Sequence, residues 1–250
     1  MPLSIRNLTP EETSGPTTLW KYATFQKFLD FLLMKRLYFR RIDKLTDPFE
    51  GMMPPDLYSP SSSGAAEIEA AAILEKHALY IERERTKVFT NSWHQNEYES
   101  EAMWKIFGGA GHSIAITAKL SSLVKALRDQ DLTLGKVLYK DTIKDDFTLS
   151  DIFDFALLKR KPFEHEREFR LLYINNDGEH SPKLLDENGL HIHVEPKDII
   201  EAIYVSPLSE PWQAELTQHI VAREGLAERV ILSTLFKYPD SSRQRRQPRE

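Results

Sequence analysis

Glu166-Arg167-Glu168-Phe169-Arg170 is the stretch around which the predicted fold and its candidate site are organised. The residues that follow, 171–174, are apolar and aromatic, as in a buried strand. Side chains alternate between the two faces of a strand, so Glu166, Glu168 and Arg170 are predicted to share one face. Buried charge is costly unless it is compensated. The row therefore either neutralises itself as a structural Glu–Arg network or faces a cleft.

Composition narrows the class of protein. Cysteine is absent, which excludes disulfides, thiolate metal ligands and a cysteine nucleophile. No apolar run approaches the roughly 20 residues of a membrane helix, so we expect a cytoplasmic protein without a membrane partner. The net charge is −5, but residues 237–250 carry a net +3 and the remainder −8. We therefore expect any contact with nucleic acid to be local and not driven by long-range attraction.

The pattern of apolar residues predicts an α+β fold, because strands outnumber helices and do not alternate strictly with them. Residues 1–16 are predicted as an N-terminal arm, 17–236 as a single α+β domain and 237–250 as a basic, disordered tail. An Ala/Glu-rich helix at about 65–85 follows a Pro/Ser loop and is expected to cover the core as a lid. Strands are predicted at 18–22, 37–42, 88–93, 112–119, 135–139, 166–174, 190–194, 199–205 and 230–235, and further helices at 25–33, 100–107, 121–129, 149–160 and 210–223.

Six short segments occur in the same order as in a bacterial protein family of unknown function, which the chain resembles over about residues 17–236. The ordered set is specific, although no single segment is. Thr46 stands before the turn where the family pattern has Asn. The segments are Trp20-Lys21-Tyr22, Leu37-Tyr38-Phe39, Asp47-Pro48-Phe49-Glu50-Gly51, Ser92, Met103-Trp104 and the E-x-E-[aromatic]-R strand that ends at Arg170.

A more distant resemblance is to the ADP-ribosyltransferase fold, in which a split, mostly antiparallel sheet flanked by helices grips NAD. The order of strands and helices is similar, and so is the late strand with its E-x-E motif. The resemblance implies Glu168 as the catalytic acid, with Glu166 beside it and Ser92 on the middle strand. It implies that Lys21 and Tyr22 bind NAD from the first strand. That strand has no His or Arg, and the middle strand lacks the family's Ser-Thr-Ser triplet.

This resemblance implies NAD-dependent ADP-ribosyl transfer or NAD cleavage, with NAD as the substrate, no metal, and a protein or nucleic acid as acceptor. Breaking the bond between nicotinamide and ribose builds positive charge on the ribose carbon, which a nearby carboxylate stabilises. Tyr38 and Trp93 are the aromatic residues expected beside the nicotinamide ring. Arg40, Arg41 and Arg170 are the candidates to hold the pyrophosphate. The role implied is that of a bacterial toxin or defence effector.

Two other classes stay open. A non-catalytic regulatory protein would use the same cleft to bind a nucleotide or a protein partner. A metal-dependent nuclease would use Asp47, Glu166 and Glu168, although a strand of that kind needs a basic residue where Glu168 stands. Trp104, in the helix predicted at 100–107, is expected to pack in the core and to affect a site only indirectly.

Overall fold

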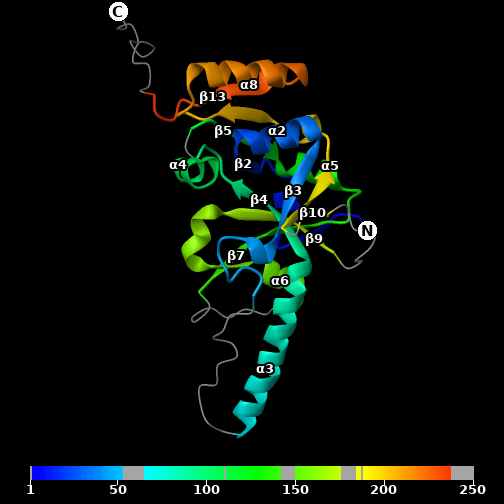
Figure 1. The fold of residues 1–250 in the computed structure, drawn as a ribbon. Helices are drawn as coiled ribbons and strands as arrows, with labels where there is room; N and C mark the ends of the chain where they lie inside the picture. Colours follow the sequence, from blue (N-terminus) through cyan, green and yellow to red (C-terminus); the bar gives the residue numbers. More distant parts are fainter. Residues whose placement is uncertain are drawn as a thin grey trace, which may run out of the picture.

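The computed structural model describes residues 2–52, 65–109, 111–141, 150–175, 184–186 and 188–237 (Figure 1). Helices pack against a mostly antiparallel sheet of 11 strands, which confirms the α+β class. The predicted Pro/Ser loop at 54–64 and residues 238–250 of the predicted tail lie outside the described residues. Within the described part of the chain, no helix has the length and apolar character needed to cross a membrane.

The strands of the sheet follow the order β1-β6-β9-β4-β2-β5-β12-β13, and β3, β11 and β10 branch from β4. Its described pairs are antiparallel apart from β1–β6 and β12–β13. β7 and β8 form a separate parallel pair. The strands are β1 Ser4–Arg6, β2 Thr18–Thr24, β3 Arg36–Arg41, β4 Val88–Gln95, β5 Ser113–Lys119, β6 Thr133–Lys136, β7 Leu138–Lys140, β8 Leu158–Arg160, β9 Glu168–Ile174, β10 Leu184–Asp186, β11 Gly189–His193, β12 Ala202–Val205 and β13 Val230–Leu232.

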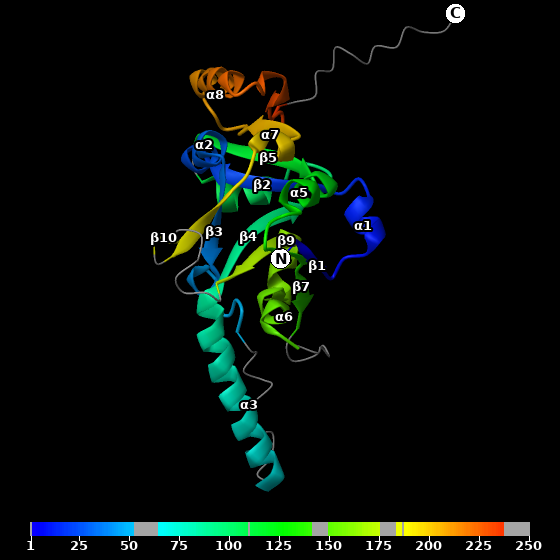
Figure 2. The same cartoon turned by 90° about the vertical axis from the view of Figure 1, so that its right-hand side faces the viewer.

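The helices surround the sheet, with α2 against β2, β3 and β5 and with α8 beyond β12 and β13 (Figures 1 and 2). α2 follows Thr24, as predicted, and buries Phe28, Phe31 and Leu32 in the main core. The helices are α1 Pro10–Ser14, α2 Phe25–Met34, α3 Ala65–Glu84, α4 Glu101–Met103, α5 Leu120–Leu127, α6 Ile152–Ala156, α7 Pro196–Ile199 and α8 Pro211–Arg223. Short 3₁₀ helices occupy Ile42–Lys44, Arg85–Lys87, Lys161–Glu166 and Ala227–Arg229, and a π-helical turn spans Trp104–Gly108.

The N-terminal residues belong to the sheet, which corrects the prediction of an arm over 1–16. β1 pairs in parallel with β6, and Arg6 forms ion pairs with Asp151 at 2.6 Å and Asp154 at 3.2 Å. Thr9 and Glu12 form a capping box at the start of α1. The sequence prediction missed this segment because its prolines and glycine outweighed a very short strand whose partner lies more than 120 residues away.

The strand that carries the E-x-E motif begins later than predicted, and the helix before it is shorter. Glu166 ends the turn Lys161–Glu166, Arg167 has a positive φ of 42°, and β9 begins at Glu168. Of the helix predicted at 149–160, only residues 152–156 are helical among those described, as α6. Residues 158–160 form the strand β8. Glu166 and Glu168 therefore do not share a strand face through simple alternation. They converge because the backbone turns at Arg167.

α3 projects away from the sheet in Figures 1 and 2, so it is not the lid that the sequence predicted. Its apolar residues Ile68 and Leu79 are 56% and 61% exposed, whereas a lid over the core would bury such side chains. α3 is anchored near its end, where Ile81 packs with Phe155 of α6. In α8, Trp212 and Leu216 are exposed while Thr217 and Val221 are buried.

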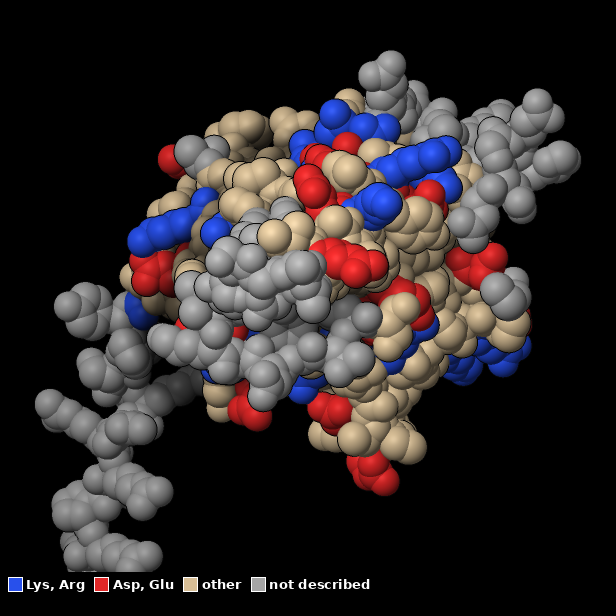
Figure 3. Space-filling model, turned by 90° about the horizontal axis from the view of Figure 1, so that it is seen from below, with Lys and Arg blue, Asp and Glu red and all other residues tan. Residues whose placement is uncertain are grey.

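Charged residues are mixed by sign on the face seen from below, where lysines and arginines lie among aspartates and glutamates (Figure 3). Neither sign dominates that face, so long-range attraction of a polyanion to it is weak.

Candidate functional site

The sheet divides at β4, and this division creates the candidate site. β4 pairs with β2 near its end, where His94 lies opposite Trp20. It pairs with β3 near its start, where Thr90 lies opposite Arg40. Between these points residues 91–93 pair with neither β2 nor β3, although the other edge of β4 pairs with β9 from Val88 to His94. The edge of β4 therefore opens over residues 91–93.

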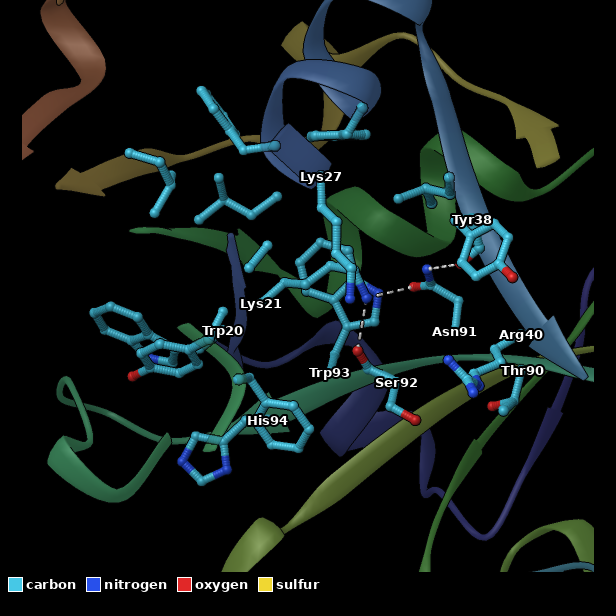
Figure 4. A pocket seen from close by; sticks show the side chains of 18 of the residues that line it. Trp20, Lys21, Lys27, Tyr38, Arg40, Thr90, Asn91, Ser92, Trp93 and His94 are labelled. Carbon is cyan, nitrogen blue, oxygen red and sulfur yellow. Dashed lines mark hydrogen bonds between the residues drawn. The ribbon is translucent and has the colours of Figure 1, made fainter. Parts of the chain in front are cut away.

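Side chains replace the missing strand partner in this opening (Figure 4). The Lys21 amine donates to the carbonyl oxygen of Ser92 at 2.9 Å and to Oδ1 of Asn91 at 3.2 Å. Nδ2 of Asn91 donates to the carbonyl oxygen of Tyr38 at 2.8 Å. A buried carbonyl without a donor is unfavourable, so Lys21 and Asn91 stabilise the divided sheet.

A cavity of about 600 Å³ occupies the opening and extends between α2, β2, β3 and β4. Its walls combine aromatic rings with charged side chains, a composition suited to a ligand that has both a ring and an anionic group. The aromatic lining residues are Trp20, Tyr22, Phe28, Phe31, Tyr38, Trp93 and Phe107. The titratable or charged lining residues are Lys21, Lys27, Asp30, Arg36, Arg40, His94, Glu166, Glu168 and His191.

Most residues predicted for the site lie in the walls of this one cavity. Arg170 does not, because its side chain is 1% exposed and lies beneath Glu168. Arg41 is also absent from the walls and forms an ion pair with Asp43. The predicted residues that line the cavity are Lys21, Tyr22, Tyr38, Arg40, Ser92, Trp93, Glu166 and Glu168.

Three carboxylates surround one ammonium group at the end of the cavity that Glu166 and Glu168 line. Nζ of Lys159, on β8, lies 2.7 Å from Glu168, 2.8 Å from Glu166 and 3.1 Å from Glu50. Arg170 lies on the other side of Glu168 and contacts Glu50 at 2.8 Å. All five side chains are buried, so their charges interact in a medium that screens them weakly. Glu166, Glu168 and Arg170 therefore belong to a buried ion network, as in the interpretation that the charged residues neutralise one another.

Both oxygens of Glu168 accept hydrogen bonds within the network. Oε1 accepts from Lys159 at 2.7 Å and from Arg170 at 3.1 Å, and Oε2 accepts from Arg170 at 3.0 Å. Burial acts to raise the pKa of Glu168, but the charges of Arg170 and Lys159 outweigh it and hold the pKa well below its usual value. Burial and the neighbouring charge of Glu168 raise the pKa of Glu166, against the effect of Lys159. The two carboxylates thus differ in their affinity for a proton.

His94, Trp93 and Thr90 bring unpartnered polar atoms to the cavity walls. Nδ1 of His94 lies 2.6 Å from the carbonyl oxygen of Glu166, so Nδ1 carries the proton and Nε2 is an acceptor. Burial lowers the pKa of His94, which favours this neutral form. Nε2 of His94, Nε1 of Trp93 and Oγ1 of Thr90 are buried without a hydrogen-bond partner among the described residues. Buried polar atoms without partners are uncommon and indicate that a ligand or water completes the site.

Sequence reasoning missed Lys159 and Glu50 because local patterns assigned them elsewhere. Lys159 fell in the predicted helix, and Glu50 was assigned to a turn. The signal that was available for Glu50 is its place in the Asp47–Gly51 motif, one of the six ordered segments. Asp47, considered for a metal site, forms an ion pair with Arg160 at 2.9 Å. The carboxylates of Glu166 and Glu168 both pair with the ammonium group of Lys159.

Comparison of the chain with models of protein families, with curated proteins and with solved structures gave no match.

Proposed function

We propose that the cavity binds NAD and that the protein cleaves the bond between nicotinamide and ribose, transferring ADP-ribose to an acceptor or to water. The observation that carries this proposal is the position of Glu168, an ionised carboxylate in the wall of a cavity that is also lined by aromatic rings and by lysine and arginine side chains. The cleft lies where the sheet divides, which agrees with the resemblance to ADP-ribosyltransferases noted in the sequence.

Glu168 supplies negative charge at neutral pH because its pKa is low, and its neighbours fix its orientation. A fixed carboxylate stabilises positive charge that develops on the ribose carbon as nicotinamide leaves. Glu166 has the higher proton affinity of the two and takes the proton of the attacking hydroxyl or water. This division of roles follows from the opposite directions of the two pKa shifts.

Cations and rings elsewhere in the cavity match the other parts of NAD. The Arg40 side chain is exposed, and among the described residues its guanidinium forms one hydrogen bond, from Nε to the carbonyl of Lys44, so its other N–H groups can bind a phosphate. Lys27 is exposed at the same cavity. Tyr38 and Trp93 supply ring faces for nicotinamide or adenine. The acceptor class, protein or nucleic acid, is part of the proposal and rests on the resemblance alone.

Release of free nicotinamide from NAD by the purified protein tests the proposal. Glu168→Gln is expected to lower the rate by on the order of 10²–10³, because the transition state loses its stabilising charge. Glu164→Gln is the matched control, since Glu164 is exposed in the same segment and pairs only with Lys161 among the described residues. All three proteins are assayed well below their melting temperatures. Absence of nicotinamide release by the wild type under conditions that saturate NAD binding would refute catalysis.

A second candidate is nucleotide binding without catalysis, as in a regulatory protein. It is favoured by the hydrogen bonds that already occupy both oxygens of Glu168, which a ribose hydroxyl would have to share. Calorimetric titration with NAD and ADP separates the two functions. Binding of both nucleotides without nicotinamide release would assign the cavity to recognition alone.

A further inference from the structure

Two lysine amines converge in the cavity without a carboxylate between them. Lys21 extends from β2 and Lys27 from α2, and their amines point toward one another beside Trp93 (Figure 4). Neither lysine forms an ion pair within the described part of the chain. The negative charge of Glu168 acts to raise the pKa of Lys21, but the Glu168 carboxylate is hydrogen-bonded to Lys159 and Arg170. Such an arrangement of like charges favours loss of a proton from one amine.

The two hydrogen bonds that Nζ of Lys21 donates leave the lone pair of the neutral amine without a contact to these acceptors. Nζ makes two hydrogen bonds, to the Ser92 carbonyl and to Oδ1 of Asn91, and lies 5.3 Å from the centre of the Trp93 ring. A neutral amine has two N–H donors and one lone pair. The two acceptors use both donors, which leaves the lone pair available to a molecule in the cavity.

The charges around Lys21 favour this neutral form. Burial of the amine and the positive charge of Lys27 lower the pKa of Lys21 to about 7, against the opposing effect of Glu168. The other charged groups of the walls near α2 are paired with one another, since Asp30 binds both Arg36 and His191. A lysine that is buried beside a second cation is the arrangement that activates an amine as a nucleophile.

We propose that Lys21 is a reactive amine that forms an imine with an aldehyde or ketone carrying an anionic group. The nitrogen lone pair attacks the carbonyl carbon, a C=N bond replaces C=O, and the carbonyl oxygen leaves as water with the two amine hydrogens. The step needs no oxidant or reductant. Lys27 pairs with the anionic group of the ligand. This inference goes beyond NAD cleavage and does not depend on it.

Pyridoxal 5′-phosphate is a suitable probe because it carries an aldehyde and a phosphate. The wild-type protein is treated at neutral pH with less than one equivalent, the imine is reduced with borohydride, and the labelled lysine is identified by peptide mass spectrometry. We expect Lys21 to be labelled at least roughly tenfold faster than exposed lysines such as Lys105, because a larger fraction of its amine is neutral. Labelling of Lys21 at or below the rate of Lys105 would overturn the proposal.

Two variants and one analogue extend the test without disturbing the divided sheet. Lys27→Met removes an exposed cation whose charge lowers the pKa of Lys21. We expect it to slow Lys21 labelling several-fold and to raise the pH at which labelling reaches half of its maximal rate. Lys105→Met changes an exposed lysine that does not line the cavity, and it should change neither quantity. Pyridoxal, which lacks the phosphate, should label Lys21 more slowly. Unchanged labelling in Lys27→Met would overturn activation by the second amine, and equal rates for the two aldehydes would overturn the anionic requirement.

Discussion

Nζ of Lys159 lies 2.7 Å from Oε1 of Glu168, and this contact joins two segments that the sequence pattern assigned to unrelated roles. The same ammonium contacts Glu166 and Glu50. Burial acts to lower the pKa of Lys159, but the charges of Glu168 and the other carboxylates outweigh it and raise the pKa. The ion network is thus centred on a lysine, and the carboxylates of the cavity wall depend on it for compensation.

Lys159→Met is expected to lower the free energy of unfolding by about 3–5 kcal/mol, because it leaves three carboxylates around an uncharged side chain. Lys161→Met is the matched control two residues later. Its exposed pair with Glu164 is expected to contribute no more than about 0.5 kcal/mol. Urea denaturation of both variants and the wild type measures the difference. Equal stability of the two variants would show that the network does not stabilise the fold.

The sequence predicted those parts of the fold that local patterns control. Local patterns of apolar residues predicted β4, β5 and α2 close to their observed positions, because each pattern lies within one element. The partner of Glu168 was beyond such reasoning, since Lys159 meets it only after the chain turns at Arg167. The divided sheet explains why Lys21 of β2 lies in the same cavity as Ser92 and Trp93 of β4, although residues 91–93 do not pair with β2.

The position of α3 shows a second limit of sequence reasoning. Its Ala and Glu residues predict a helix correctly because helix propensity is a local property. The direction in which a helix leaves the core depends on a few distant contacts, here the packing of Ile81 against Phe155. The apolar residues Ile68 and Leu79 do not fix that direction, because single exposed apolar side chains are common on protein surfaces.

Trp104 is expected to be structural. Its ring meets Tyr22 edge-on at 5.0 Å between ring centres, and its indole nitrogen donates to Glu99 at 3.1 Å. It is 5% exposed and does not line the cavity. Trp104→Ala should lower the free energy of unfolding by about 3–5 kcal/mol. Ile106→Ala, at an exposed position of the same turn, should change it by less than about 0.5 kcal/mol. A stable Trp104→Ala protein that no longer binds NAD would contradict this assignment.

Gly189 supports Tyr38, which lines the cavity from β3. A Cβ atom at position 189 would overlap the Tyr38 ring, so Gly189→Ala must displace it. We expect roughly tenfold weaker NAD binding, equivalent to about 1.4 kcal/mol. Gly135→Ala is the matched control, because it overpacks Leu157 outside the cavity. Both changes should destabilise the fold by about 1–3 kcal/mol. Titration calorimetry that finds equal NAD affinity in the two variants would argue against a role for Tyr38.

Lys21 should make the stability of the protein depend on pH. The pKa of its amine is lowered from 10.5 to about 7 in the folded state, chiefly by burial and then by Lys27. Between these two values the unfolded chain binds a proton that the folded chain does not, so the free energy of unfolding rises with pH. Below about pH 7 both states are protonated, and the folded state carries the full unfavourable effect of the buried charge.

Lys21→Met separates this effect from the structural role of the side chain. Loss of the hydrogen bond to the Ser92 carbonyl should destabilise the variant by about 1–3 kcal/mol at every pH. The variant lacks the titrating amine, so its free energy of unfolding does not rise with pH through this group. The free energy of unfolding of the wild type minus that of the variant should therefore increase above about pH 7, by up to about 1.4 kcal/mol per pH unit. Urea denaturation of both proteins from about pH 6 to about pH 9 measures the difference, in which other titrating groups cancel. A difference that stays constant over this range would show that Lys21 has the pKa of an ordinary lysine, and the amine would then be a structural donor to β4 alone.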